Sequence, residues 1–181
     1  MTPPPYTRAE AEARETFLAL MWALSYPGRV YQLPAHKPNF ELIAGSLLDL
    51  ETSYFTVDAK LQPVLAQTSA QALPVDRAAY HFFPAIGEEH LAALGEACIG
   101  TRLYPDEAAT LFIGCALGSG LPLTLRGPGI NGAQALQVSG VPKPFWHMRQ
   151  AVCRFPLGWD VYLVDGQQIV GLPRSVQVEF K

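Results

Sequence analysis

The sequence predicts an α/β fold in which a mixed β-sheet is flanked by helices. Apolar residues recur at helical spacing near the N-terminus, apolar runs of strand length dominate the second half, and further helical segments separate those runs. Helices that alternate with strands are typical of helices packed on a sheet. The length of 181 residues suits one domain, so a single domain spanning 1–181 is expected.

Helices are predicted from capping signals and from apolar spacing. Thr7 and Glu10 have the spacing of a capping box, and a helix should follow over about 8–24. Its predicted apolar stripe comprises Phe17, Leu20, Met21 and Leu24. A second helix, capped by Asn39, is expected over about 40–50. Three more are expected over 61–70, 88–98 and 145–153.

Strands are predicted where short apolar runs are bounded by Gly or Pro. Two turns stand out: Gly118-Ser119-Gly120 suggests a hairpin between 110–116 and 121–126, and Asp165-Gly166 suggests one between 159–164 and 167–171. Alternation in the last residues predicts a half-buried final strand. The remaining strands are expected at 29–33, 51–57 and 78–83.

Composition favours a protein that has partners. Hydrophobic residues make up 49% of the chain and charged residues only 16%, so some apolar surface should remain outside the core. A surface rich in uncharged polar residues is the alternative. The net charge of −3 and the lack of a basic cluster argue against nucleic-acid binding.

Cysteine usage and hydropathy favour a cytoplasmic protein. Cys98, Cys115 and Cys153 form an odd set in apolar contexts, which is typical of thiols in a reducing compartment. No signal-peptide pattern and no apolar run of about 18 residues is present, so no membrane association is expected.

The segment Gly127–Gly132 has the spacing G-x-G-x-x-G and follows a predicted strand. A dinucleotide site would need a helix next and an acidic residue about 20 positions on, and neither is predicted. A tight turn that needs permissive φ angles is the favoured interpretation. Arg126 before this turn is compatible with an anion cradle, or with a structural arginine that fixes the loop.

Other chemistry-bearing residues give weak signals. Asp160 is interpreted either as a catalytic acid or, preferentially, as a turn or ion-pair residue. The four histidines have no metal-ligand spacing, and the four lysines lie in polar or proline-rich stretches. Neither a metal nor a cofactor is therefore expected.

Several motifs together resemble one known family. They are Ser25–Gly28, Pro105-Asp106, Leu125–Ile130, Phe155–Gly158 with Asp160, and Leu172–Arg174 before the last strand. In order and spacing this chain resembles the H subunit of the bacterial carbon–phosphorus lyase machinery, over nearly its whole length.

That resemblance implies a fold like a truncated large domain of pyridoxal-phosphate-dependent transferases, without the cofactor lysine. It implies a homodimer that joins the G, I and J subunits in a core complex. With the G, I and L partners, such subunits support transfer of an alkylphosphonate to the ribose C1 of ATP, which releases adenine and yields ribose 1-methylphosphonate 5-triphosphate.

The family offers no agreed catalytic residue, so the candidate ligand-binding residues are Arg126, Gly127, Gly129, Asp160 and Arg174. The arginines would contact phosphonate or triphosphate oxygens, the glycines would present loop amides, and Asp160 would orient an arginine. Three functions stay open: an obligate complex subunit, a self-sufficient transferase acting on ATP, and a phosphonate- or nucleotide-binding module without catalysis.

Overall fold

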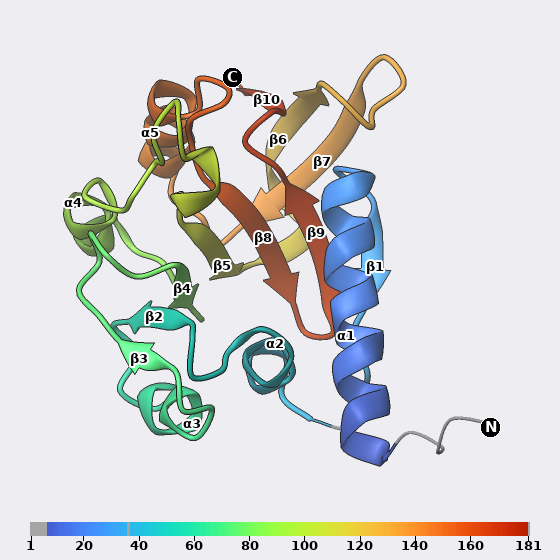
Figure 1. Cartoon of the computed structure of the whole chain (residues 1–181). Coiled ribbons are helices and arrows are strands. Elements are labelled where there is room, and N and C mark those ends of the chain that lie inside the picture. The colour runs from blue at the N-terminus through green and yellow to red at the C-terminus, as the bar shows by residue number, and fades with distance from the viewer. Residues whose placement is uncertain (1–6, 36, 181) are drawn as a thin grey trace.

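The computed structural model describes residues 7–35 and 37–180, and its centre is a mixed seven-stranded sheet (Figure 1). The strand order is β1-β9-β8-β5-β4-β2-β3. Strands β2, β3, β4, β5 and β8 run parallel, whereas β9 runs antiparallel between β8 and β1. The strands of this sheet are β1 (Val30–Gln32), β2 (Ser53–Thr56), β3 (Gln71–Ala72), β4 (Tyr80–Phe83), β5 (Thr110–Gly114), β8 (Asp160–Asp165) and β9 (Gln168–Leu172). The predicted α/β fold with a mixed sheet is therefore confirmed.

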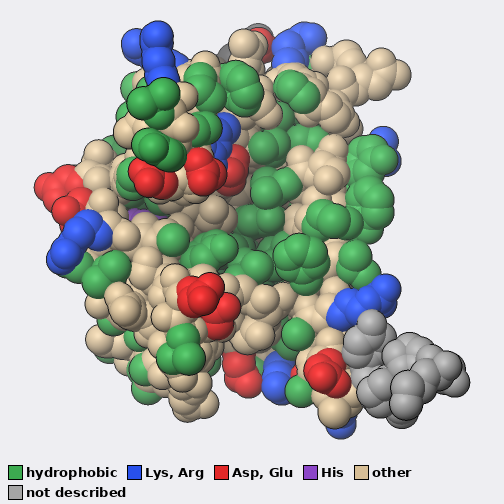
Figure 2. Space-filling model, viewed as in Figure 1, with side chains coloured by type: hydrophobic (Ala, Val, Ile, Leu, Met, Phe, Trp, Pro, Cys, Tyr) green, Lys and Arg blue, Asp and Glu red, His purple; other side chains and the backbone are tan. Residues whose placement is uncertain are grey.

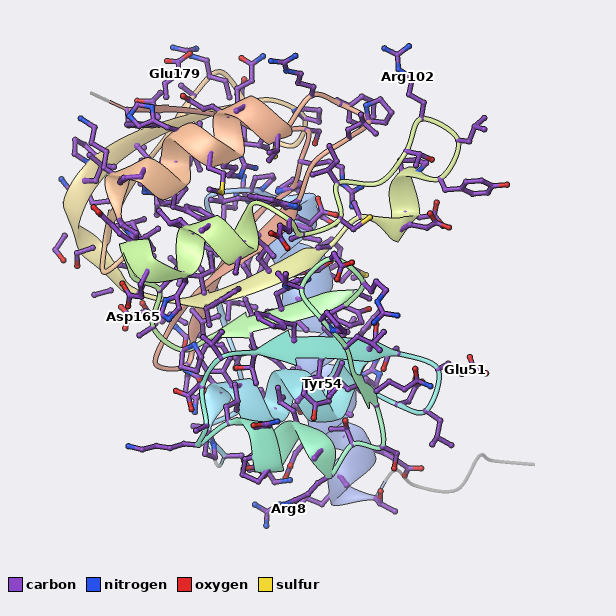
Figure 3. The ribbon with its side chains drawn as sticks, turned by 90° about the vertical axis from the view of Figure 1, so that its left-hand side faces the viewer. Arg8, Glu51, Tyr54, Arg102, Asp165 and Glu179 are labelled. Carbon is purple, nitrogen blue, oxygen red and sulfur yellow. The ribbon has the colours of Figure 1, made fainter. Side chains whose placement is uncertain are left out.

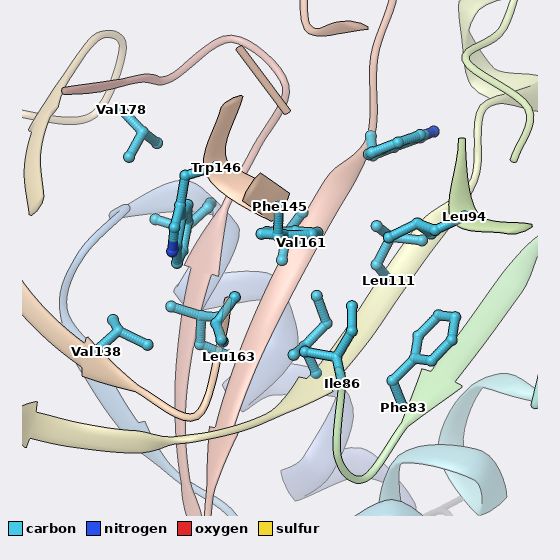
Figure 4. Close-up of a cluster of buried hydrophobic side chains, with 14 of the residues drawn as sticks. Phe83, Ile86, Leu94, Leu111, Val138, Phe145, Trp146, Val161, Leu163 and Val178 are labelled. Carbon is cyan, nitrogen blue, oxygen red and sulfur yellow. The ribbon is translucent and has the colours of Figure 1, made fainter. Parts of the chain in front are cut away.

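Helices and a second sheet cover the two faces of this sheet. One face packs on α1 (Arg8–Ser25), α2 (Asn39–Leu47) and α3 (Gln62–Ala66). The other packs on α4 (Leu91–Leu94), α5 (Lys143–Val152) and a three-stranded sheet. Figure 4 shows the hydrophobic core on this second face, where Phe145 and Trp146 of α5 pack near Val161 and Leu163 of β8. Within the described residues, none of the helices combines the length and hydropathy that a membrane span requires.

The three-stranded sheet has the order β10-β6-β7, and it corrects one prediction. Its strands are β6 (Ala116–Arg126), β7 (Gln134–Ser139) and β10 (Gln177–Phe180). The predicted hairpin at Gly118–Gly120 is wrong, because these residues lie inside β6, where the register with β7 shifts between Leu117 and Leu121. The glycines therefore accommodate a bulge rather than a turn. The segment 131–141, for which no strand was predicted, supplies β7.

The longest helix begins as predicted but buries a different face. Thr7 and Glu10 form the predicted capping box. The buried residues include Thr16, Ala19 and Ala23. Of the predicted apolar stripe, Leu20 is buried and Leu24 is partly buried, whereas Phe17 and Met21 are exposed. Small residues face the sheet because α1 approaches β9 closely: a Cβ at Gly171 would lie 2.5 Å from the backbone carbonyl atoms of Ala23. Such an approach leaves no room for a large side chain.

Other helices are shorter than predicted. The expected helix over 88–98 is a 3₁₀ turn, Glu88–His90, followed by the single turn of α4, and α3 covers only five residues of the expected 61–70. Pro38 precedes α2 as its cap residue, so Asn39 is the first helical residue rather than the cap. The Asn39 side chain instead donates a hydrogen bond to the Gly166 carbonyl oxygen at 2.7 Å.

The central strands follow the sequence signals closely. The predicted hairpin at Asp165-Gly166 is confirmed, since β8 pairs antiparallel with β9 and Asp165 faces Gln168. Across β4, β5 and β8, three rings stack in register: Phe82 lies 5.0 Å from Phe112, which lies 4.9 Å from Tyr162, between ring centroids. This ladder fixes the register of the parallel strands and thereby the position of Asp160 at the start of β8.

Candidate functional site

Asp160 and Arg174 form the most extensive polar contact among the residues predicted from the sequence. Arg174 Nη2 donates to Asp160 Oδ2 at 2.6 Å, and Arg174 Nε lies 3.2 and 3.3 Å from the two carboxylate oxygens. The backbone N–H of Arg174 also donates to Asp160 Oδ1 at 2.8 Å, and Nη1 donates to the Pro105 carbonyl oxygen. The two side chains are only 14% and 19% exposed. Of the two roles considered for Asp160, the structure shows the ion pair, which holds the 173–176 segment against the start of β8.

Arg149 of α5 is a second arginine attached to the same segment, and it is 1% exposed. Its Nη1 donates to the Val176 carbonyl oxygen at 3.1 Å, and its Nη2 donates to the carbonyl oxygens of Leu172 and Pro173 at 3.2 and 2.9 Å. Its Nε has no hydrogen-bond partner. Burial lowers the pKa of the guanidinium, because a low-dielectric surrounding disfavours the charged form. No carboxylate in the described parts of the chain forms an ion pair with it.

A groove of about 430 Å³ runs between α5 and the 173–179 segment. Three arginines line it: the buried Arg149 of α5, Arg174, which is paired with Asp160, and the exposed Arg154 in the turn after α5. Asp160 neutralises only one of these three guanidinium groups. In Figure 3, Glu179 lies above α5, whereas Arg102 lies away from α5, on the loop that precedes Pro105–Glu107. The groove therefore carries an excess of positive charge.

The remaining lining residues of the groove are polar and apolar in equal number. Gln150 donates from Nε2 to the Val178 carbonyl oxygen at 2.6 Å, and Gln177 is exposed on β10. The exposed ring of Phe155 closes one side. The full lining is Arg149, Gln150, Cys153, Arg154, Phe155, Arg174, Ser175, Val176, Gln177, Val178 and Glu179.

The predicted glycine loop has a structural role. The φ angles of Gly127 and Gly129 are 143° and 81°, and a Cβ at these positions would lie 3.0 Å from the Ser175 carbonyl oxygen and 2.6 Å from that of Ser25. Strand β7, not a helix, follows the loop, so the dinucleotide interpretation is wrong and the tight-turn interpretation is confirmed.

Arg126 lies at the end of β6 and does not line the groove. Its Nε lies 3.7 Å from Glu179 Oε1, and the two side chains are 52% and 59% exposed. Exposed pairs of this kind contribute little to stability. Of the two arginines predicted to bind an anion, the structure therefore places only Arg174 in the groove.

Sequence reasoning missed Arg149, Gln150 and Arg154. A signal for Arg149 was present, because it follows the buried Phe145 and Trp146 by four and three residues and so shares their face of α5. An arginine on the apolar face of a helix indicates either a buried partner or a ligand. The exposed Gln150 and Arg154 carry no comparable signal.

His81 is the most strongly perturbed histidine. It is fully buried in β4 between the rings of Phe55 and Phe83, and burial lowers its pKa from 6.5 to about 4. Its Nε2 lies 3.0 Å from the Ala78 carbonyl oxygen. His36 lies outside the described residues, and within those residues no cluster of three or more metal-ligating side chains occurs. His81 is thus a neutral core residue at physiological pH.

Comparisons with known proteins agree with the resemblance noted from the motifs. The family model for PhnH, the bacterial phosphonate metabolism protein, matches residues 4–179. A relative from Stutzerimonas stutzeri, described as a candidate C-P lyase subunit and named HtxG, is 35% identical, with 91% of this chain and 85% of the relative covered. The PhnH subunit of α-D-ribose 1-methylphosphonate 5-triphosphate synthase from Rhizobium meliloti (strain 1021) is 30% identical, with 93% and 90% covered. The chain therefore belongs to the PhnH family of bacterial phosphonate metabolism proteins.

Proposed function

We propose that this chain is a subunit of a carbon–phosphorus lyase core complex. In this role it supports transfer of an alkylphosphonate to the ribose C1 of ATP, with release of adenine. The observation that carries the proposal is the match over residues 4–179 to a family whose similar members are named as subunits of this system. The proposal includes a cytoplasmic location and a core fold related to the large domain of pyridoxal-phosphate-dependent transferases.

An exposed apolar surface on α1 supports an assembly role. Phe17, Trp22 and Tyr26 are 51%, 43% and 39% exposed. The Trp22 and Tyr26 rings stack at 5.7 Å, and the Arg29 guanidinium lies 5.0 Å from the Tyr26 ring centroid. Figure 2 shows hydrophobic side chains gathered on this side of the molecule, over α1. Large aromatic residues beside an arginine are typical of the energetic centre of a protein interface.

The proposed occupants of this surface are a second copy of the chain or the G, I and J subunits. Strand β1 lies beside α1 at an edge of the seven-stranded sheet, and Val30 on it is 47% exposed. An unpaired edge next to an apolar helix face extends the area available to a partner. Homodimer formation and complex formation are both part of the proposal.

Co-purification tests the proposal. Tagged chain should retain the G, I and J subunits, and with the L subunit added the complex should release adenine from ATP and methylphosphonate. Phe17→Ser should weaken retention, whereas Leu50→Ser, which removes an apolar side chain 75% exposed elsewhere, should not. Retention unaffected by Phe17→Ser would refute the role of α1. Adenine release by the isolated chain would refute the supporting role.

A further inference from the structure

We propose that the groove between α5 and β10 binds a tetrahedral oxyanion, the phosphoryl or phosphonyl group of a ligand. Arg154 is the principal direct contact, Gln150 and Gln177 are neutral donors, and Arg149 supplies positive charge from beneath. The inference deepens the proposed function and rests on it for the biological source of the anion. The binding itself is a property of this chain alone.

Arg149 carries a buried positive charge that its surroundings compensate only in part. A guanidinium that is 1% exposed is costly to bury unless a nearby negative charge balances it. Three carbonyl oxygens satisfy part of its hydrogen-bonding capacity, but they carry no net charge, and Nε has no partner. The carboxylate that acts electrostatically on Arg149, Asp160, also pairs with Arg174, so one negative charge is shared between two guanidinium groups. An anion in the groove would supply the missing charge.

Arg154 is positioned to contact an anion directly. It is exposed, it lines the groove, and within the described residues no carboxylate forms an ion pair with it. A guanidinium of this kind can donate two parallel hydrogen bonds to a phosphate or phosphonate group. The opposing charge at the rim, Glu179, faces Arg126 at 3.7 Å and is partly compensated by it.

The groove has the size and lining of a small-molecule site. Its volume of about 430 Å³ lies within the range of small-molecule sites, and its lining combines a few polar side chains with the exposed Phe155 ring. An aromatic face beside a phosphate subsite is suited to stacking against a nucleotide base. The oxyanion therefore belongs either to a free alkylphosphonate or to a nucleotide such as ATP, and Phe155 distinguishes these two sources.

The experiment is a titration of the isolated chain at low salt. Binding is monitored by calorimetry and by the NMR resonances of the Gln150 and Gln177 side-chain amides. The probes are methylphosphonate, inorganic phosphate and ATP, with chloride as the non-tetrahedral control. Binding is expected to shift both amide resonances and to weaken as salt increases. Arg154→Gln should reduce affinity about tenfold or more, because it removes a charge-assisted contact.

Matched variants locate the site. Arg77→Gln makes the same change of charge at an exposed position outside the groove and should alter affinity by less than about twofold, because distant exposed charges are screened. Gln177→Glu should weaken binding and Gln177→Lys should strengthen it, each by about threefold, as expected for an exposed charge near the anion. A loss of ATP affinity in Phe155→Ala, with methylphosphonate affinity unchanged, would identify a nucleotide as the source of the anion, whereas unchanged affinity for both ligands would identify a free phosphonate.

Failure of this inference can be told apart from failure of the proposed function. The inference is overturned if none of the three probes binds, or if Arg154→Gln binds as tightly as the unmodified chain. It is also overturned if Arg126→Gln abolishes binding while Arg154→Gln does not, since the anion would then lie at the loop after β6. Co-purification with the other subunits does not depend on any of these results.

Discussion

Replacement of Asp160 by Asn should test how strongly the ion pair with Arg174 stabilises the fold. The substitution keeps the size of the side chain but removes its charge and places an amide N–H against a guanidinium donor. Loss of one partner costs up to about 5 kcal/mol in a buried pair and about 1 kcal/mol or less at the surface. With side chains 14% and 19% exposed and four contacts between the residues, we expect a loss of about 2 kcal/mol.

Urea denaturation followed by tryptophan fluorescence measures this loss. With a slope of about 2 kcal/mol per molar, the midpoint should fall by about 1 M. Glu179→Gln is the control, because it breaks the exposed pair with Arg126 and should change stability by less than about 0.5 kcal/mol. Equal effects of Asp160→Asn and Glu179→Gln would show that water screens the Asp160–Arg174 pair and that the reasoning from burial is mistaken.

Three further predictions concern the core. The pKa of His81 is about 4 in the folded protein, against 6.5 for an unburied histidine. Between these pH values the unfolded chain binds a proton that the folded chain does not, so the free energy of unfolding is unaffected by His81 above pH 6.5 and decreases as the pH falls toward 4. His81→Phe should therefore remove this decrease, which amounts to up to about 3 kcal/mol in the free energy of unfolding. A variant whose free energy of unfolding depends on pH as that of the unmodified chain does would contradict this. Gly171→Ala should destabilise by about 1–3 kcal/mol, because its Cβ would lie 2.5 Å from the Ala23 backbone; a thermal midpoint unchanged in calorimetry would show that α1 moves away without cost. Tyr162→Phe should cost about 1 kcal/mol in urea denaturation, because it removes the 3.1 Å hydrogen bond from its hydroxyl to the Leu20 carbonyl oxygen, and full stability would mean that this bond is exchanged for an equivalent one.

Signals carried by neighbouring residues predicted much of the architecture. The errors lie where contacts between residues that are apart in the sequence decide the structure. The capping box at Thr7 and the hairpin at Asp165-Gly166 depend on a few adjacent residues, so the sequence displays them directly. The glycines at 118–120 look the same in a bulge as in a turn. What decides between the two is the pairing of β6 with β7, in which both Leu117 and Leu121 face Val138, and this partner cannot be read from the glycines themselves.

The outward face of α1 could not be predicted for a similar reason. Phe17 and Met21 satisfy helical periodicity as well as Ala19 and Ala23 do, so the spacing alone favours burial of the larger side chains. The contact with Gly171 reverses that choice, because the backbone of β9 lies too close to the helix for a large residue.

The candidate site was predicted in part. The residues around Asp160 favoured a turn or ion-pair role, and the structure shows the ion pair with Arg174, whereas a role of either residue in ligand binding stays a prediction. Arg126 was predicted, like Arg174, to contact an oxyanion, but the pairing of β6 with β10 places it beside Glu179 and outside the groove. The groove is formed by α5 and β10, which are separated by 24 residues of intervening chain, so only tertiary structure brings their side chains together.

Arg149 and Arg174 affect which parts of the molecule unfold together. Strand β10 is hydrogen-bonded into the small sheet, yet the segment that leads to it is attached by these arginines to α5 and to the start of β8. Cooperative units in hydrogen exchange are defined by which contacts must break together. Because these two side chains join β10 to the large sheet, we expect the amide protons of β10 to exchange together with those of the seven-stranded sheet rather than before them.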